Sequence, residues 1–281
     1  MTITGAARRL LPGKAVHATM TTLGDRHPSA TDLLYQRDAY LQEFEATVSA
    51  VDAERGAVAL SATAFYPGGG GQPCDTGSLS TSDGAETWNV MSLERAGASP
   101  WHLLQPAARL PVVGETLRGR VDWPSRLLLM RTHTAMHALC GTIFRDYGAL
   151  VTGGNMGLER ARMDFEMEEF TADRVAEIER TVNDGLARER DVRVRIVPRD
   201  EAFRIPDLIR TKINLLPEGI PEIRIVEIVG LDLQADGGTH VANTREVGGI
   251  KIVGTRSKGR VNKRLEIVLT GREGDAVAEG A

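Results

Sequence analysis

The stretch Leu127-Leu-Leu-Met-Arg-Thr-His-Thr-Ala-Met-His-Ala-Leu-Cys-Gly141 has the length and apolar content of a buried helix, and it contains two of the six histidines, His133 and His137. Residues four apart lie on one face of an α-helix with Cβ atoms about 5–6 Å apart, so these imidazoles can bind one metal ion. A third ligand must come from another part of the chain. An isolated pair with this spacing is also compatible with two hydrogen-bonded imidazoles.

A second motif, Gln234-Ala-Asp-Gly-Gly-Thr-His240, supplies the missing ligands. It carries the only other histidine in the second half of the chain, His240, and Asp236 stands four residues before it. Three histidines and one carboxylate form a nitrogen and oxygen donor set that suits a divalent metal ion, with a water molecule as the reagent. The second motif therefore favours a metal site over two structural imidazoles.

Length and composition indicate two domains without a membrane segment. The chain has 281 residues, of which 42% are hydrophobic, enough for a sizeable core. Its formal net charge of −4 gives no global attraction to nucleic acid, so such a partner would need a local basic surface. The two cysteines, Cys74 and Cys140, show no C-x-x-C spacing, and no stretch reaches about 18 consecutive apolar residues. We expect a cytoplasmic protein with no disulfide framework, no membrane contact and no obligate protein partner.

The first domain is predicted to be a small antiparallel β-barrel over residues 31–122. Short alternating segments separated by turns are typical of a barrel or a sandwich. The residues 1–30 before it and 270–281 at the other end show little periodicity, and we expect both to be flexible. His102 alternates with apolar neighbours, which favours a structural role. The expected strands are 44–51, 58–62, 87–93, 101–104 and 116–122.

Four consecutive glycines interrupt this pattern within Phe65-Tyr-Pro-Gly-Gly-Gly-Gly-Gln-Pro73. Glycine costs backbone entropy in a strand and adds no packing surface, so the run needs another explanation. One explanation is a flexible linker. We favour a shaped loop because aromatic and proline residues restrain its ends. Such a loop lets a ligand approach the backbone closely, and we predict that it binds substrate. The predicted contacts are Gly69, Gly70, Gly71 and Gln72.

The second domain, residues 123–269, is predicted to be α+β, with helices packed on one face of a mostly antiparallel sheet. Asp122 and Pro124 mark the start of the long helix, and Gly148 marks its end. Helical spacing returns after Thr171. Strands are expected at 161–166, 192–197, 223–229, 251–253 and 265–269, with a turn-rich segment at 151–157 and an irregular excursion with a short helix at 202–221.

Three motifs together resemble one family. The chain contains, in order, Phe65-Tyr-Pro-Gly-Gly-Gly-Gly-Gln-Pro73, His133-Thr-Ala-Met-His137 and Asp236-Gly-Gly-Thr-His240. This combination resembles the medium-length class of the AlaX family, the free-standing alanyl-tRNA editing proteins, which are similar to the editing domain of alanyl-tRNA synthetase. The resemblance covers residues 31–269. It implies an N-terminal small antiparallel β-barrel followed by the α+β editing domain shared by threonyl- and alanyl-tRNA synthetases.

The resemblance also implies an ATP-independent hydrolase that serves translation fidelity. Its substrate would be mischarged tRNA(Ala), chiefly Ser-tRNA(Ala) and secondarily Gly-tRNA(Ala). His133, His137 and His240 match the zinc ligands of the family. Asp236 is a departure, because it occupies the position where the synthetase editing motif usually has cysteine. A carboxylate binds Zn²⁺ less tightly than a thiolate does and leaves it more electrophilic. We expect one Zn²⁺ per chain with Asp236 as the fourth ligand, and the sequence leaves the identity of the metal open.

An aminoacyl ester is already activated, so the enzyme mainly has to place a water molecule against its carbonyl carbon. A metal ion could lower the pKa of that water, or it could bind the substrate's amino group and orient the ester; the sequence does not choose. Thr134 and Thr239 flank the ligands and are predicted to hydrogen-bond the hydroxyl of serine, which would explain rejection of alanine. Asp164 is predicted to orient a ligand imidazole, with surface placement as the alternative.

A basic run follows the second motif, Lys251-Ile-Val-Gly-Thr-Arg-Ser-Lys-Gly-Arg-Val-Asn-Lys-Arg264, and it contains no acidic residue. Such a run is usually a solvated face. Its position after the ligand motif nevertheless favours contacts with the phosphates of the tRNA acceptor stem. The predicted contacts are Lys251, Arg256, Lys258, Arg260, Lys263 and Arg264, with Arg193 and Arg195 extending the same face.

Other functions remain compatible with these motifs. A metallohydrolase of another small ester or amide would turn over a non-tRNA ester without binding tRNA. A catalytically weakened tRNA-binding module, compromised at Asp236, would bind tRNA after metal chelation and would not deacylate it. An aminoacylating synthetase is disfavoured, because the chain leaves no room for a separate ATP-dependent catalytic domain.

Overall fold

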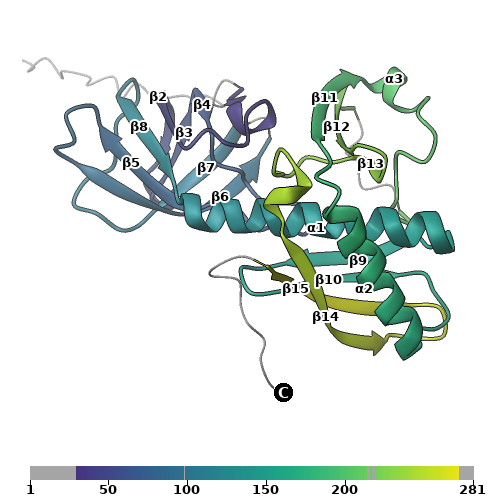
Figure 1. Ribbon diagram of the computed structural model, residues 1–281. Helices are drawn as coiled ribbons and strands as arrows, with labels where there is room; N and C mark the ends of the chain where they lie inside the picture. The colour runs from purple at the N-terminus through teal and green to yellow at the C-terminus, as the bar shows by residue number, and fades with distance from the viewer. Residues whose placement is uncertain (1–29, 98, 214–215, 217–218, 272–281) are drawn as a thin grey trace, which may run out of the picture.

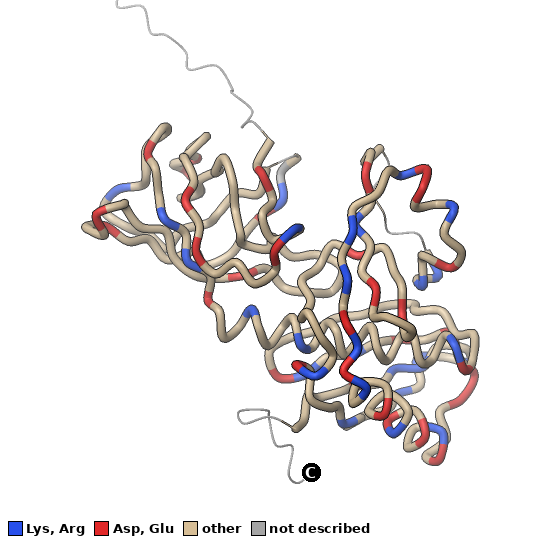
Figure 2. Tube along the Cα trace, turned by 45° about the horizontal axis from the view of Figure 1, so that its top comes forward, with Lys and Arg blue, Asp and Glu red and all other residues tan. Residues whose placement is uncertain are grey.

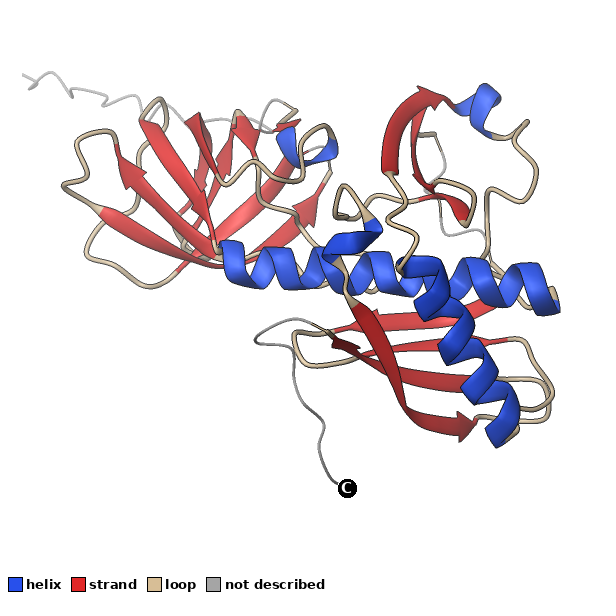
Figure 3. Cartoon of the chain, viewed as in Figure 1, coloured by secondary structure: helices blue, strands red, loops and turns tan. Residues whose placement is uncertain are grey.

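The computed structural model describes residues 30–271, apart from residues 98, 214–215 and 217–218. The two ends predicted to be flexible therefore lie outside the described residues, except for Ala30, Thr270 and Gly271. A β-barrel and a long central helix come first along the chain, and a four-stranded sheet follows, with a three-stranded sheet inserted between its second and third strands (Figures 1 and 3). No helix among the described residues is both long and apolar enough to cross a membrane.

Six antiparallel strands close into the predicted barrel, in the order β2-β3-β7-β6-β5-β8. Alternating side chains such as Phe44, Leu79 and Leu117 fill its interior. His102 is fully buried there, within hydrogen-bonding distance of Thr63 Oγ1 (2.9 Å), which agrees with the predicted structural role. The strands are β2 (Glu43–Asp52), β3 (Ala57–Leu60), β5 (Gly77–Thr81), β6 (Thr87–Ala96), β7 (Ser99–Leu104) and β8 (Thr116–Val121), and outside the barrel lie β1 (Asp32–Leu33), β4 (Ala62–Thr63) and the 3₁₀ helix η1 (Leu34–Gln36).

The central helix α1 (Trp123–Tyr147) begins directly after the barrel and ends as the sequence predicts. Pro124 lies in its first turn, and Gly148 caps its last turn with a φ of 64°, donating its N–H to the carbonyl oxygen of Phe144. Most side chains between residues 129 and 143 are buried, because the helix runs between other elements along its length. A buried helix of this kind holds its polar side chains in fixed surroundings.

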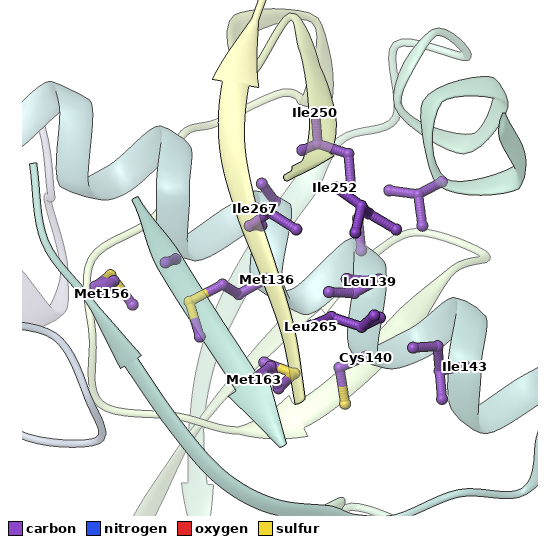
Figure 4. Packing of buried hydrophobic residues seen from close by; sticks show 14 of the residues in the cluster. Met136, Leu139, Cys140, Ile143, Met156, Met163, Ile250, Ile252, Leu265 and Ile267 are labelled. Carbon is purple, nitrogen blue, oxygen red and sulfur yellow. The ribbon is translucent and has the colours of Figure 1, made fainter. Parts of the chain in front are cut away.

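A four-stranded antiparallel sheet, in the order β14-β15-β10-β9, packs one face against α1 and α2 (Ala172–Leu186). Figure 4 shows the resulting core, in which Met136, Leu139 and Ile143 of α1 face Leu265 and Ile267 of the sheet. Helices on one face of an antiparallel sheet confirm the predicted fold class. The strands are β9 (Val151–Met156), β10 (Ala161–Phe165), β14 (Gly249–Ser257) and β15 (Lys263–Thr270), with the 3₁₀ helix η2 (Thr244–Glu246) before β14.

Two features of this half of the chain differ from the sequence prediction. Residues 151–157 were expected to form a turn-rich segment, yet most of them form the edge strand β9. The remaining strands form a second sheet, in the order β11-β12-β13, which lies on the other side of α1 (Figure 1). This sheet has its own small core with α3 (Arg199–Ala202), and its strands are β11 (Val192–Pro198), β12 (Glu222–Ile228) and β13 (Asp232–Ala235).

A buried ion pair fixes the barrel to the start of α1. Arg126, fully buried, donates from Nε to Asp75 Oδ1 (2.9 Å), and from its other nitrogens to the carbonyl oxygens of Ala64 (2.6 Å) and Ala39 (3.0 Å). Paired charges and satisfied hydrogen bonds make this contact geometrically specific. Because Asp75 closely follows the glycine run, the pair also fixes where that loop lies along the helix.

Candidate metal centre

The structure brings the four predicted metal ligands together. His133 and His137 come from α1, and Asp236 and His240 come from the loop after β13. Their candidate donor atoms all lie within 4.8 Å of one another. The Asp236 carboxylate lies 3.1 Å from His240 Nε2, 3.5 Å from His133 Nε2 and 3.9 Å from His137 Nε2. The histidines are at most 5% exposed, so the cluster is shielded from bulk water.

Each of the three imidazoles makes a hydrogen bond through its Nδ1 atom, which points away from the centre of the cluster. His133 Nδ1 lies 3.0 Å from the amide oxygen of Gln72, and His137 Nδ1 lies 3.0 Å from the carboxylate of Asp232. Both oxygens can only accept, so both Nδ1 atoms carry the proton and donate. Their Nε2 atoms therefore present lone pairs to the centre of the cluster. This is the arrangement by which proteins orient metal-binding histidines.

The third imidazole follows the same rule through Thr134. The Thr134 hydroxyl donates to the carbonyl oxygen of Met130 (2.9 Å), so it can accept from His240 Nδ1 at 3.2 Å. Thr239 is also committed within the protein, because its Oγ1 accepts from the side-chain amide of Gln72 (2.8 Å). Both threonines are 0% exposed. Both hydroxyls thus make hydrogen bonds within the protein beside the cluster, and their contact with the hydroxyl of serine stays a prediction.

Four acceptors consequently face one another in a buried space. Three Nε2 lone pairs and the Asp236 carboxylate repel unless a cation or a proton lies among them. Although burial disfavours a charged imidazole, hydrogen bonds and charge from Asp232 and Asp236 raise the pKa of His137 to about 9. Burial lowers the pKa of His133 to about 4 and that of His240 well below its usual value. One positive charge is thus favoured at this position, and the donor set fits a divalent metal ion.

The loop after β13 requires glycine at position 238, where its backbone lies against the imidazole of His133. A Cβ on Gly238 would lie 2.3 Å from His133 Cε1 and 2.6 Å from the side-chain oxygen of Gln72, far inside contact distance. Arg224 fixes the same loop by donating to the carbonyl oxygens of Asp236 (3.0 Å) and Gly238 (2.8 Å). The loop geometry therefore depends on a missing side chain as well as on hydrogen bonds.

Comparisons with known proteins identify the family. Residues 223–266 match the threonyl and alanyl tRNA synthetase second additional domain. The chain is 39% identical over 242 residues to the alanyl-tRNA editing protein AlaX-M of Methanosarcina barkeri, covering 85% of this chain and 99% of that protein. The AlaX-M of Saccharolobus solfataricus is 39% identical over 236 residues, which are 84% of this chain and 97% of that relative. The chain belongs to the AlaX-M family of alanyl-tRNA editing proteins. This confirms the resemblance drawn from the three motifs.

Alanine–tRNA ligases, which are longer proteins, are also similar to this AlaX-M family member over the same region. The alanine–tRNA ligase of Ignicoccus hospitalis is 37% identical over 257 residues, which cover 89% of this chain and 27% of the ligase. The match therefore spans both the barrel and the α+β part of the chain.

The glycine motif of this family member forms a tight hairpin over residues 69–72. Gln72, the last residue of this hairpin, contacts His133 in the candidate metal centre. Gly69 and Gln72 exchange two backbone hydrogen bonds of 3.0 Å, and the residues between them have φ values of 59° and 90°, as in a type I′ turn. The loop is therefore shaped, as predicted, and is not a free linker. Gly69 and Gly70 are exposed at its tip, whereas Gly71 packs on β9 so closely that a Cβ would lie 2.9 Å from the Gly154 carbonyl oxygen.

Asp164 does not orient a metal ligand. Its carboxylate accepts from Arg264 (2.6 Å) and from Lys258 (3.2 Å), and it contacts none of the three imidazoles among the described residues. Asp232 orients His137 instead. The prediction for Asp164 is corrected, because two cations of the basic run hold this buried carboxylate on the sheet and lower its pKa.

The basic run is partly neutralised within the protein. Lys251 pairs with Glu179 at 2.8 Å, and the Lys263 ammonium donates to backbone carbonyl oxygens of its own hairpin. Arg256 and Arg260 are exposed, with no acidic partner among the described residues. Figure 2 shows acidic and basic residues interspersed over the molecule. Strand β11 lies on the other side of α1 from β14 and β15 (Figure 1), so the prediction that Arg193 and Arg195 extend the same face is corrected.

Proposed function

We propose that this chain hydrolyses the ester bond of mischarged tRNA(Ala), chiefly Ser-tRNA(Ala) and secondarily Gly-tRNA(Ala), as a free-standing editing enzyme that acts without ATP. The family supports the reaction class, since its members are named alanyl-tRNA editing proteins. The observation that carries the chemistry is the convergence of three oriented Nε2 lone pairs and one carboxylate in a buried cluster. Such a protein would act in the cytoplasm, where aminoacyl-tRNA is used for translation.

We further propose that His133, His137, Asp236 and His240 hold one Zn²⁺. When bound, Zn²⁺ supplies a Lewis acid that can activate water or orient the aminoacyl group. The carboxylate of Asp236 is the most exposed of the four ligands, at 14% of its side chain, so the cluster opens toward substrate on that side. Arg224 keeps this carboxylate in place through the backbone of the loop.

Two further groups of residues are proposed to bind and position the substrate. We assign the exposed glycines Gly69 and Gly70 to contact with the terminal nucleotide, because a backbone without side chains allows close approach. Arg256 and Arg260 are the members of the basic run with no internal partner in the described structure, so they are proposed to contact phosphates.

The test is deacylation of Ser-tRNA(Ala), Gly-tRNA(Ala) and correctly charged Ala-tRNA(Ala), measured in parallel with zinc-loaded wild type and with His137→Ala. We expect selective release of serine and a loss of at least about 100-fold in the variant, since removing even a partner of a metal-bound histidine can cost that much. Gln105→Ala, which alters an exposed barrel side chain, is the matched control and should act as wild type.

Two results would redirect the assignment. If zinc-loaded wild type bound tRNA(Ala) but released no serine, and binding survived chelation, the chain would be a tRNA-binding module. If it released no serine yet hydrolysed p-nitrophenyl acetate in a zinc-dependent way without binding tRNA, it would be a hydrolase of another ester.

A further inference from the structure

An irregular segment connects β11 to β12, and the structure describes residues 203–212 of it without a gap. We call residues 203–212 the strap. Backbone hydrogen bonds join the strap to β13 of the three-stranded sheet and to β9 of the four-stranded sheet. Ala235 N donates to the Leu208 carbonyl oxygen (3.1 Å), Val151 N donates to that of Arg210 (2.9 Å), and Lys212 N donates to that of Val151 (2.8 Å). Ladder bonds on both sides of Arg210 hold its backbone in place, so the strap is a fixed part of the fold at this point.

Arg210 points from the strap toward the residue behind one metal ligand. Its guanidinium lies over the ring of Phe144 with a distance of 3.7 Å to the centroid, and its Nε lies 3.8 Å from Asp232 Oδ1. The side chain of Arg210 is 13% exposed and that of Asp232 is 0% exposed. Stacking on an aromatic face fixes the plane of a guanidinium, which is a property that lysine lacks.

The unpartnered atoms of these two residues face each other. Among the described residues, Arg210 Nε and Nη1 and Asp232 Oδ1 are buried and make no hydrogen bond. A buried polar atom without a partner is costly, and opposite charges at this separation attract strongly in a protein interior. The ion pair with Asp232 is also the only one that Arg210 makes within the described structure.

The two oxygens of Asp232 are divided between the strap and the metal centre. Oδ2 accepts from His137 Nδ1 at 3.0 Å and from the side-chain amide of Gln234 at 2.7 Å, whereas Oδ1 faces Arg210. A fully buried carboxylate with no cation near Oδ1 could rotate. Rotation would move Oδ2 away from His137 Nδ1 and so remove the acceptor that fixes the His137 tautomer.

We propose that Arg210 is a positioning residue for the metal centre: it holds the Asp232 carboxylate in the orientation that keeps His137 Nε2 directed at the metal. This assigns a role to the excursion, which the local sequence pattern describes only as irregular. The inference concerns metal binding, and it rests on the proposed function only where hydrolysis is used as a readout.

The test measures Zn²⁺ affinity by competition with a fluorescent chelator in the full chain, after folding is checked by circular dichroism. Arg210→Met keeps an apolar contact with Phe144 and removes the charge, and Arg210→Lys restores the charge. The matched control is Arg204→Met, which alters an exposed strap arginine paired with Asp200. We expect a loss of about 10–100-fold in Zn²⁺ affinity for Arg210→Met, partial recovery with lysine and no change in the control. In Ser-tRNA(Ala) hydrolysis, kcat should fall in Arg210→Met while KM stays constant.

A double-mutant cycle with Asp232→Asn tests whether Arg210 acts through Asp232. If it does, Arg210→Met lowers Zn²⁺ affinity less than twofold further in that background. A Zn²⁺ affinity within twofold of wild type in folded Arg210→Met, an equal loss in the control, or additive losses in the cycle would overturn the inference. Absence of Zn²⁺ binding in wild type would overturn it together with the proposed metal. Normal Zn²⁺ binding without serine release would overturn only the proposed reaction, and the affinities would still decide the role of Arg210.

Discussion

Gln72 links the barrel to the metal centre, and its replacement by alanine tests whether that link matters. The side chain is 2% exposed. Its oxygen accepts from His133 Nδ1 (3.0 Å) and from Thr239 N (3.1 Å), and its nitrogen donates to Thr239 Oγ1 (2.8 Å). Gln72→Ala removes all three hydrogen bonds and leaves two buried donors without an acceptor.

The size of the effect follows from these contacts. Each buried donor left unsatisfied costs about 1–3 kcal/mol, so the free energy of unfolding should fall by about 2–4 kcal/mol after some relaxation. Loss of the partner of a metal-bound imidazole lowers metal affinity about 10–100-fold, or about 1.4–2.8 kcal/mol. Gln72→Glu keeps an acceptor for both donors, so its Zn²⁺ affinity should stay near that of wild type.

Two measurements check this prediction. Chelator competition gives the Zn²⁺ affinity of wild type, Gln72→Ala and Gln72→Glu, and urea unfolding of the zinc-loaded proteins gives their stability. Gln105→Ala is the control, because this exposed barrel glutamine bonds only Asn89 in the described structure. The reasoning is refuted if folded Gln72→Ala binds Zn²⁺ within twofold of wild type, or if Gln72→Glu loses as much affinity as Gln72→Ala.

Three further predictions follow from the site and the barrel. Asp236→Cys should bind Zn²⁺ more tightly in chelator competition, since thiolate is the softer ligand; unchanged or weaker binding would argue against direct ligation at this position. Asp75→Ala leaves fully buried Arg126 without its counter-charge, and urea unfolding should show a loss of about 3–5 kcal/mol, whereas a loss below 1 kcal/mol would contradict the packing. Burial lowers the pKa of His102 to about 4. In the unfolded chain the pKa of this histidine is near 6.5, so below that pH the unfolded state binds a proton that the folded state does not. The free energy of unfolding therefore decreases as the pH falls from 6.5 toward 4. Between pH 7.5 and 5 this group should cost about 2 kcal/mol, a part of the pH dependence that His102→Gln should lack.

A helix or strand could be predicted where apolar residues recur with the period of that element, because such an element buries one of its faces. The helix after Thr171 and five of the six barrel strands show this periodicity, and the structure has them at nearly the expected positions, whereas β5 (Gly77–Thr81) was not predicted. Strand β9 could not be found this way, because Val151-Thr-Gly-Gly-Asn-Met156 is rich in glycine and polar residues. It is a strand because β10 pairs with one of its edges and Gly71 of the barrel accepts from Met156 on the other. Tertiary pairing overrides local propensity here.

The convergence of His133, His137, Asp236 and His240 could be predicted because their spacing within two short motifs is itself informative, whereas the partners of these histidines could not. Asp232 and Gln72 are 95 and 61 residues away from the histidines they hold, and no local pattern marks them. Asp164 was assigned to a ligand imidazole because it follows the helix in sequence. Its neighbour in space is Arg264, 100 residues later, which the pairing of β10 with β15 places opposite it.

The glycine-rich motif is best understood as a contact between two parts of the fold. Gly71 has no side chain because the carbonyl oxygen of Gly154 lies against it, and Gly238 has none because His133 and Gln72 occupy that space. The barrel therefore contributes a side chain to the metal centre and requires glycine on both sides of the contact. The candidate metal centre is thus built from residues of both parts of the fold. The orientation of His133 therefore depends on a residue of the barrel.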